Sequence, residues 1–145
     1  DTNPRAERPE VQAGRASQID AARAGQMMQV MDQQMIPKYL AAPQDRPDIL
    51  QTCRDMAQRL DPEGFITQSL ALRNRRDQRD SLRRYSGKSL VLCGRQDQLC
   101  PLDRHEEMHQ LLTNSALVIV ENAGHLPTLE QPEQTTAALQ RWLED

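Results

Sequence analysis

Hydrophobic positions follow two different patterns along the chain. From residue 9 to residue 85 they recur every three or four residues, which is the spacing of amphipathic helices. The clearest stripe consists of Ile49, Cys53, Met56 and Leu60. Its four-three-four spacing predicts that these residues share one helix face. Asp61 and Pro62 then predict the N-cap and the first position of the next helix. Asp80 is expected to cap a last short helix. The first part of the chain is therefore predicted to be helical throughout.

A second stripe in this helical stretch is made of methionines, namely Met27, Met28, Met31 and Met35. A stripe of this kind is usually core packing. In a functional interpretation, it forms an adaptable apolar wall over a substrate pocket. Both interpretations stay open, because one helix face can serve both purposes.

After residue 88 the pattern changes to short runs of consecutive apolar residues. The runs 89–93 and 116–120 have the length of strands, and consecutive apolar residues are typical of strands buried on both faces. Helices are expected over 102–112 and 132–143. The order strand, helix, strand, helix predicts parallel strands and an α/β fold. Two parallel strands do not form a stable sheet alone, so further strands are expected from elsewhere.

The composition argues against nucleic-acid and membrane partners and favours a reducing compartment. The chain has 145 residues and a net charge of −3, which gives no support for nucleic-acid binding. No apolar run approaches the length of a membrane span, so no membrane partner is expected. Cys53, Cys93 and Cys100 are odd in number and form no C-x-x-C pair, which favours free thiols in a reducing, cytoplasmic compartment. The start at Asp1 rather than at methionine suggests a truncated, processed or partly ordered chain.

Two loop motifs carry the candidate chemistry. The first run is followed by G-x-x-D-x-x-x-P, in which Asp97 is the acid, and the second by G-H-x-x-x-x-E-x-P, which begins at Gly124 and His125. With the strands and helices around them, these motifs resemble the end of the α/β-hydrolase fold, from about Lys88 onward. The preceding helices resemble the lid of that family, with weaker motifs. The resemblance implies a partial α/β-hydrolase fold, with a lid region at 1–86 and the C-terminal part of the core at 87–145.

Asp97 and His125 are the predicted catalytic residues. Both follow the carboxyl ends of neighbouring parallel strands, where α/β sheets place their sites, so their side chains can meet. The resemblance implies that His125 is the general base and acid and that Asp97 orients it. Gly124 is expected to let the backbone turn tightly before the histidine. Taken singly, Asp97 would be interpreted as a turn residue and His125 as a loop histidine; order and spacing together favour the triad.

The family's nucleophile, in a G-x-S-x-G elbow upstream of the lid, is not found in this sequence. None of the six serines has that context: Ser17, Ser69, Ser81, Ser86, Ser89 and Ser115. The chain alone is therefore expected to be inactive, and its expected partners are the missing N-terminal half of the core and a small-molecule substrate. The parent is expected to be a serine hydrolase that acts on an ester or similar acyl bond without a cofactor. Asp1 is a weaker rival for the acid.

A competing motif, H-E-x-x-H, spans His105 to His109. It matches the helix of zinc metalloproteases, with Glu106 as the general base. The segment 102–104 is not the apolar lead-in of a buried zinc helix, and no convincing third ligand sits on a following helix, since Glu121 falls at a strand end. We therefore interpret the motif as a chance match, with both histidines on the surface and no metal bound. Cys100, beside the acid loop, is expected to be a packed residue. The other alternative to a catalytic serine hydrolase is a non-catalytic binding module that keeps the hydrolase fold.

Overall fold

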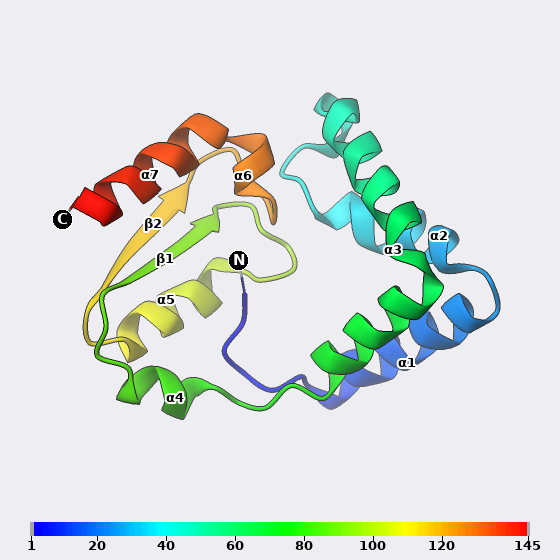
Figure 1. Ribbon diagram of the computed structural model, residues 1–145, viewed down its shortest axis with the longest axis horizontal. Helices are drawn as coiled ribbons and strands as arrows, with labels where there is room; N and C mark the ends of the chain where they lie inside the picture. Colours follow the sequence, from blue (N-terminus) through cyan, green and yellow to red (C-terminus); the bar gives the residue numbers. More distant parts are fainter. Residues whose placement is uncertain (1, 145) are drawn as a thin grey trace. The chain divides into compact units, whose positions relative to one another are not determined.

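The computed structural model describes residues 2–144, which form two compact units (Figure 1). The first, here called the strand unit, comprises the residues up to 4, residues 38–45 and the residues from 78 onward. The second, here called the helical unit, comprises residues 5–37 and 46–77. The segment 38–45 therefore packs with the strands, although it lies in the sequence between the two parts of the helical unit. The predicted domain boundary between residues 86 and 87 stays a prediction.

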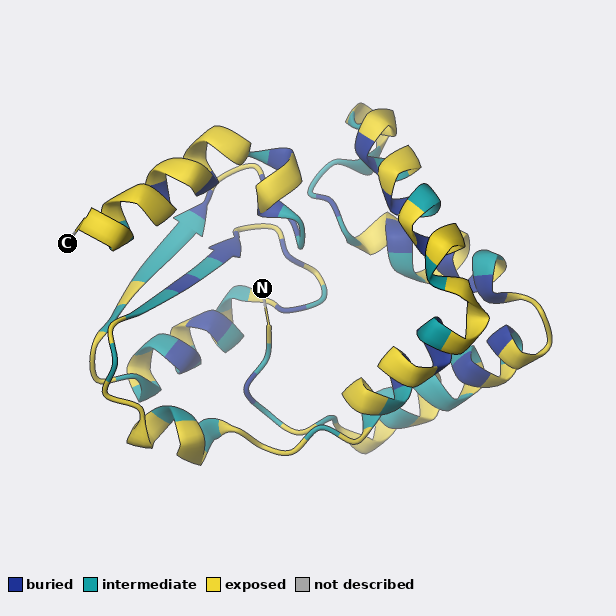
Figure 2. Cartoon of the chain, in the orientation of Figure 1, coloured by how far each residue is buried: buried dark blue, intermediate teal, exposed yellow. Residues whose placement is uncertain are grey.

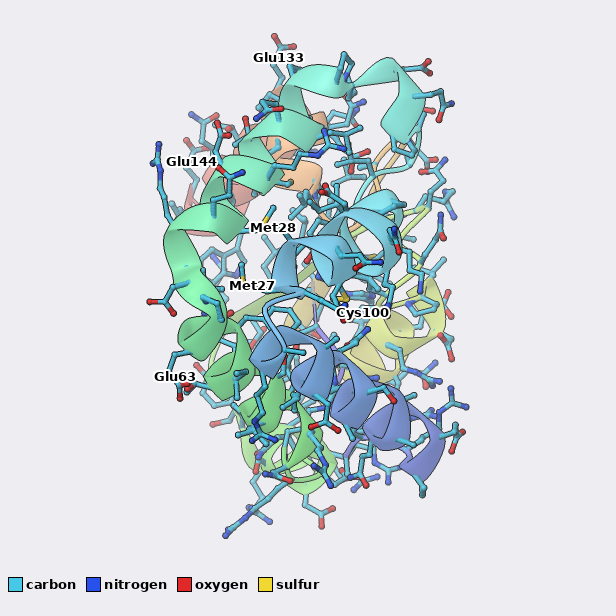
Figure 3. The ribbon with its side chains drawn as sticks, turned by 90° about the vertical axis from the view of Figure 1, so that its right-hand side faces the viewer. Met27, Met28, Glu63, Cys100, Glu133 and Glu144 are labelled. Carbon is cyan, nitrogen blue, oxygen red and sulfur yellow. The ribbon has the colours of Figure 1, made fainter. Side chains whose placement is uncertain are left out.

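The helical unit contains α1 (Pro9–Arg23), α2 (Met27–Val30), a π-helical turn (Met31–Met35) and α3 (Pro47–Arg73); a 3-10 turn (Ile36–Lys38) leads out of it. Helices α1 and α3 pack against each other. Met27 and Met31 are buried, so core packing accounts for this part of the methionine stripe. Met28 is half-buried beside Met27 at the start of α2 (Figure 3).

Helix α3 is interrupted at Asp61, whose φ of 62° is non-helical. The Asp61 carboxylate accepts a hydrogen bond of 2.8 Å from the main-chain N–H of Gly64. This is the bond that an N-cap side chain makes to the third helical residue, and Pro62 stands at the first helical position. The predicted helix start is therefore confirmed.

Two details of the helical prediction are wrong. Met56 is 62% exposed, and Ala57 occupies the buried position beside Cys53 instead. An α-helix has 3.6 residues per turn, so a buried stripe can shift by one position. Here the smaller side chain, that of Ala57, lies on the packed face of α3. Asp80 is not the cap of the short helix α4 (Arg79–Arg84), because Gln78 precedes that helix. Asp80 lies in its first turn and pairs with Arg83 instead.

The strand unit contains β1 (Ser89–Gly94), α5 (Leu102–Leu111), β2 (Ser115–Val120), α6 (Pro127–Glu130) and α7 (Pro132–Glu144). It also holds α4 and a 3-10 turn (Pro43–Asp45). The strands pair in parallel, from Ser89 opposite Ser115 to Gly94 opposite Val120. Helices α5 and α7 lie on opposite sides of the strands (Figure 1). The α/β class, the parallel pairing and the order of elements are confirmed, whereas the short helix α6 was not predicted.

The sheet of the described residues has two strands and is only partly covered. Val91, Cys93 and Val120 are buried, but Leu90 and Leu92 are only partly buried in spite of their apolar side chains. Figure 2 shows the resulting mixture of buried and partly buried positions along both strands. Incomplete cover of apolar strands is what a partial α/β fold predicts. No helix within residues 2–144 is long and apolar enough to cross a membrane.

Candidate active site

Asp97 and His125 meet beyond the carboxyl ends of the two strands. The imidazole Nδ1 of His125 lies 2.9 Å from the carboxylate Oδ2 of Asp97. The Asp97 side chain is fully buried, whereas that of His125 is 25% exposed. Because a carboxylate only accepts hydrogen bonds, Nδ1 carries the proton and donates it. The contact that the sequence predicts is therefore present, and Nε2 of a neutral His125 keeps its lone pair.

The second oxygen of Asp97 is held by its own loop. Oδ1 accepts hydrogen bonds from the main-chain N–H groups of Leu99 at 2.8 Å and Cys100 at 3.0 Å. Burial by itself would raise the pKa of the Asp97 carboxyl, but the bond from His125 and these two N–H groups outweigh it and lower the pKa below the usual value of 3.8. Asp97 is therefore an ionised, oriented acceptor for the imidazole at neutral pH.

Close main-chain approach joins the two loops. A Cβ atom on Gly94 would overlap the carbonyl oxygens of Ala123 and Gly124, so only glycine fits at the end of β1. The N–H of Gln96 donates to the carbonyl of Ala123 at 2.9 Å, and the N–H of Ala123 donates to the Gln96 side chain at 3.1 Å. These contacts fix the acid loop against the histidine loop.

Gly124 is needed for a different reason from the one that the sequence suggests. Its φ is not among the positive values of the described residues, so a tight turn is not its role; the left-handed residue is Asn122, with φ 55°. A Cβ on Gly124 would come within 2.7–2.8 Å of main-chain atoms of Tyr39, Leu40 and Ala41. The glycine therefore allows the segment 38–45 to lie directly against the histidine loop.

Tyr39 is a site residue that the sequence did not indicate. Its carbonyl accepts a hydrogen bond of 2.7 Å from the N–H of His125, and the two rings lie 6.2 Å apart between centroids. Tyr39 is far from His125 in the sequence and stands in no motif. Glu130 is a second such residue, because its carboxylate accepts a hydrogen bond from the N–H of Gly124. It belongs to the G-H-x-x-x-x-E-x-P motif, so the motif could have indicated it.

The H-E-x-x-H helix places its two histidines in different surroundings. The prediction that both are surface residues is wrong for His105, which is 1% exposed, because it shares the packed face of α5 with Met108. Its ring nitrogens face the carbonyl of Pro101 and the N–H of Thr2, each at 3.4 Å. His109 is half-buried and lies 2.8 Å from the Ser115 hydroxyl.

Within residues 2–144, one group of side chains has the composition of a metal site, and it is Asp97, Cys100 and His125, whose ligand atoms lie within 4.8 Å of one another. The H-E-x-x-H residues are not part of it. Within this group, Asp97 and His125 already form a hydrogen bond with each other. Cys100, labelled in Figure 3, is buried beside them, as expected for a packed residue.

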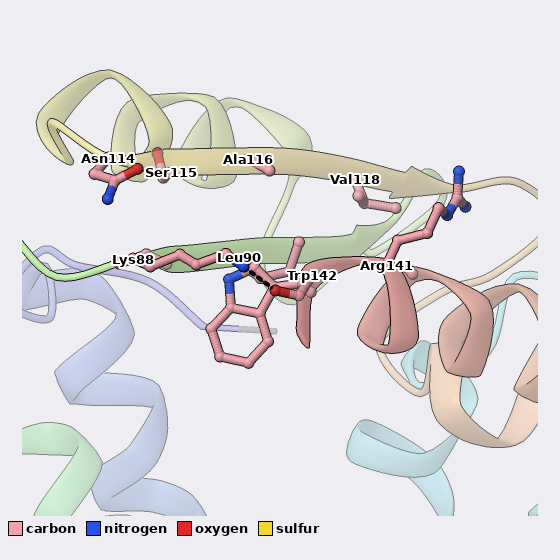
Figure 4. A pocket seen from close by; sticks show the side chains of 10 residues that line it. Lys88, Leu90, Asn114, Ser115, Ala116, Val118, Arg141 and Trp142 are labelled. Carbon is pink, nitrogen blue, oxygen red and sulfur yellow. Dashed lines mark hydrogen bonds between the residues drawn. The ribbon is translucent and has the colours of Figure 1, made fainter. Parts of the chain in front are cut away.

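A cavity of about 330 Å³ lies at the other end of the strands (Figure 4). It is lined by the residues that begin each strand, such as Ser89 and Ser115, and by Arg141 and Trp142 of α7. The Lys88 ammonium contacts the carbonyl of Trp142 and lies 5.7 Å from the centroid of its ring. This cavity is therefore separate from the pair of Asp97 and His125. The rival acid Asp1 lies outside the described residues.

Comparison with known proteins identifies the family. The sequence model of the alpha/beta hydrolase fold matches residues 57–132, which is just over half of the chain. The chain belongs to this family.

Solved structures agree with that assignment. An esterase from Thermogutta terrifontis, solved with malate bound, superposes on this alpha/beta hydrolase chain with a TM-score of 0.89 at 30% identity, over 99% of this chain and 53% of the esterase. The enol-lactonase from Burkholderia xenovorans gives 0.86 at 23% identity, over 99% and 54%. An esterase from Exiguobacterium antarcticum gives 0.80 at 22% identity, over 98% and 54%. The last two show the fold alone. The chain spans about half the length of these structures, and curated sequences give no significant match.

Proposed function

We propose that the chain is the C-terminal part of a serine hydrolase that cleaves an ester or similar acyl bond with a Ser-Asp-His triad. The observation that carries the proposal is the hydrogen bond of 2.9 Å between His125 and the buried carboxylate of Asp97, at the ends of two parallel strands. The serine and the oxyanion hole would come from the upstream half of the core. The relative at 30% identity is described as an esterase, which supports the ester bond as the substrate class.

The geometry suits the chemistry of acyl transfer. Because Nδ1 of His125 donates to Asp97, Nε2 can accept the proton of the serine hydroxyl as its oxygen attacks the acyl carbon. The resulting imidazolium is stabilised by the ionised Asp97, and Nε2 then returns the proton to the leaving alcohol. Water repeats the same two transfers in the second half of the reaction and releases the acid. No cofactor takes part in these steps.

The upstream half is the proposed macromolecular partner of the strand unit. On α7, Leu139 and Leu143 are 43% and 73% exposed at a spacing of four residues, so they form an uncovered apolar stripe. Leu90 and Leu92 of β1 are only partly buried and could be covered in the same way. Additional strands and helices of an α/β core would supply this cover.

The helical unit is proposed to act as the lid over the substrate, in line with the predicted lid region 1–86. The half-buried Met28 and Met35, which are flexible and polarisable, would allow its apolar surface to adapt to acyl groups of different shape. The three cysteines are free and buried, which supports a reducing, cytoplasmic location.

The test is reconstitution of the complete core. The longer chain that includes the upstream half should hydrolyse a chromogenic acyl ester, whereas the 145-residue chain should show no turnover. His125→Ala in the longer chain should abolish turnover, with His109→Ala as the matched control outside the triad. An active His125→Ala variant would refute the proposed function. An inactive longer chain that lacks any upstream nucleophile would favour a non-catalytic binding module.

A further inference from the structure

Glu130, the last residue of α6, has a buried carboxylate to which the triad gives no role. The residue is only 7% exposed. Removing a carboxylate from water is costly unless hydrogen bonds compensate for the lost solvation. The partners of this carboxylate therefore indicate what it does in the fold.

The two oxygens of Glu130 bind two segments that are far apart in the sequence. Oε1 accepts a hydrogen bond of 2.7 Å from the N–H of Ala41, and Oε2 accepts one of 2.7 Å from the N–H of Gly124. Both distances are at the short end of the range for N–H···O hydrogen bonds, so the two contacts are well formed. Gly124 immediately precedes His125, so the carboxylate holds the main chain on which the imidazole is mounted.

A further main-chain contact completes the attachment. The N–H of His125 donates to the carbonyl of Tyr39 at 2.7 Å, and the missing side chain of Gly124 gives the segment 39–41 room to lie against this loop. Three hydrogen bonds thus join the segment 39–41, the pair Gly124–His125 and Glu130. We call this arrangement the Glu130 clamp. All its members belong to the strand unit.

We propose that Glu130 is a positioning residue for His125. By clamping the main chain of Gly124 to that of Ala41, it keeps the imidazole within hydrogen-bonding distance of Asp97. The proposal rests on the proposed function, because the position of the imidazole affects turnover only if His125 transfers protons. In Glu130→Gln, one carboxylate oxygen becomes an NH₂ group, which cannot accept from an N–H. One of the two main-chain donors then loses its partner, and the loop can move away from Asp97.

The experiment uses the longer hydrolase chain with the upstream half. Glu130→Gln should lower kcat by about 10- to 100-fold, the scale expected for a catalytic group displaced by about 1 Å, while KM changes less than about twofold. The imidazole Nδ1–H resonance of His125, observed by NMR in ¹⁵N-histidine protein, should broaden or move upfield as its bond to Asp97 weakens. Glu133→Gln, an exposed substitution three residues further along, is the matched control and should change neither quantity.

The outcomes separate this proposal from the proposed function. An active His125→Ala variant refutes the proposed function. An inactive His125→Ala variant, together with wild-type kcat and an unchanged Nδ1–H resonance in Glu130→Gln, refutes the clamp alone. If Glu130→Gln does not fold, Glu130→Asp keeps the charge but is one methylene shorter and cannot reach both donors. It should show an intermediate kcat, and a wild-type value there also overturns the proposal.

Discussion

The imidazole of His125 donates from Nδ1 to Oδ2 of Asp97 across 2.9 Å, while Oδ1 of the same carboxylate is occupied by the N–H groups of Leu99 and Cys100. The two oxygens therefore have separate duties: one anchors the acid to its loop, and the other orients the histidine. An acid held in this way cannot rotate to follow a displaced imidazole. The relationship has direct consequences for mutation and for pH.

Replacing Asp97 by asparagine should remove activity without removing the fold. The amide is nearly isosteric, but its NH₂ group can face His125 and favour the wrong imidazole tautomer. In serine proteases the equivalent change costs about 10⁴-fold in kcat, and we expect a loss of that order for Asp97→Asn in the longer hydrolase chain. Ester turnover and circular dichroism are the measurements. Asp103→Asn, on the exposed start of α5, is the control and should retain activity. Retention of full activity in Asp97→Asn would remove Asp97 from the triad.

The lowered pKa of Asp97 predicts a loss of stability in acid. Because the folded-state pKa lies below the usual 3.8, the ionised carboxylate stabilises the fold fully above about pH 4 and loses this contribution as the pH falls through the folded-state pKa. The difference in free energy of unfolding between wild type and Asp97→Asn should therefore be largest near neutral pH and shrink below about pH 4. Urea unfolding at pH 6 and pH 3 measures it. Asp48→Asn, whose carboxylate is exposed beside Arg46, should give a much smaller difference.

The close approach at Gly124 predicts a strong position effect for glycine-to-alanine substitutions. Gly124→Ala places a methyl group within 2.7–2.8 Å of main-chain atoms that cannot move without displacing the segment 38–45. Overpacking of this kind costs about 1–3 kcal/mol. Gly14→Ala is the matched control, since Gly14 lies inside α1 with no atom near its missing Cβ, and alanine there should stabilise by about 0.5–1 kcal/mol. Thermal unfolding of both variants decides the matter, and equal effects would contradict this account of Gly124.

Local patterns predicted most of the fold. The strands, their parallel order and the helix start at Asp61 follow from apolar runs, capping residues and proline, which act over a few residues. The pair of Asp97 and His125 follows as well, because two parallel strands place their following loops at one edge. Tyr39 could not be found in this way. Its carbonyl binds the N–H of His125, and a contact between main-chain groups does not require a particular side chain. The contact also joins parts of the chain that are far apart in the sequence.

Burial of single side chains was the least predictable feature. His105 was expected at the surface because the H-E-x-x-H motif was interpreted as a chance match, yet it is 1% exposed. The reason is geometric: it shares the packed face of α5 with Met108, three residues later, and both ring nitrogens face main-chain groups. Met56 shows the opposite case, because the smaller Ala57 takes the buried place. Which of two neighbouring positions faces the core depends on packing that a spacing rule does not resolve.

The surroundings of His105 and His109 predict how the H-E-x-x-H helix responds to metal. A zinc protease helix presents both imidazoles to one ion, but here His105 faces the main chain of Pro101 and Thr2, and His109 faces the hydroxyl of Ser115. Zinc binding would have to break these contacts and would still lack a third ligand, because the H-E-x-x-H residues belong to no group of three potential ligands within residues 2–144. These contacts lead to an expectation for the purified protein. It should contain no stoichiometric zinc, and its melting temperature should be the same with and without a chelator. His109→Ala should leave the metal content and the ester turnover of the longer chain unchanged. Elemental analysis of the wild type and this variant is the measurement. About one zinc per chain in the wild type, lost in His109→Ala, would show that the helix binds metal and would reopen the metalloprotease interpretation.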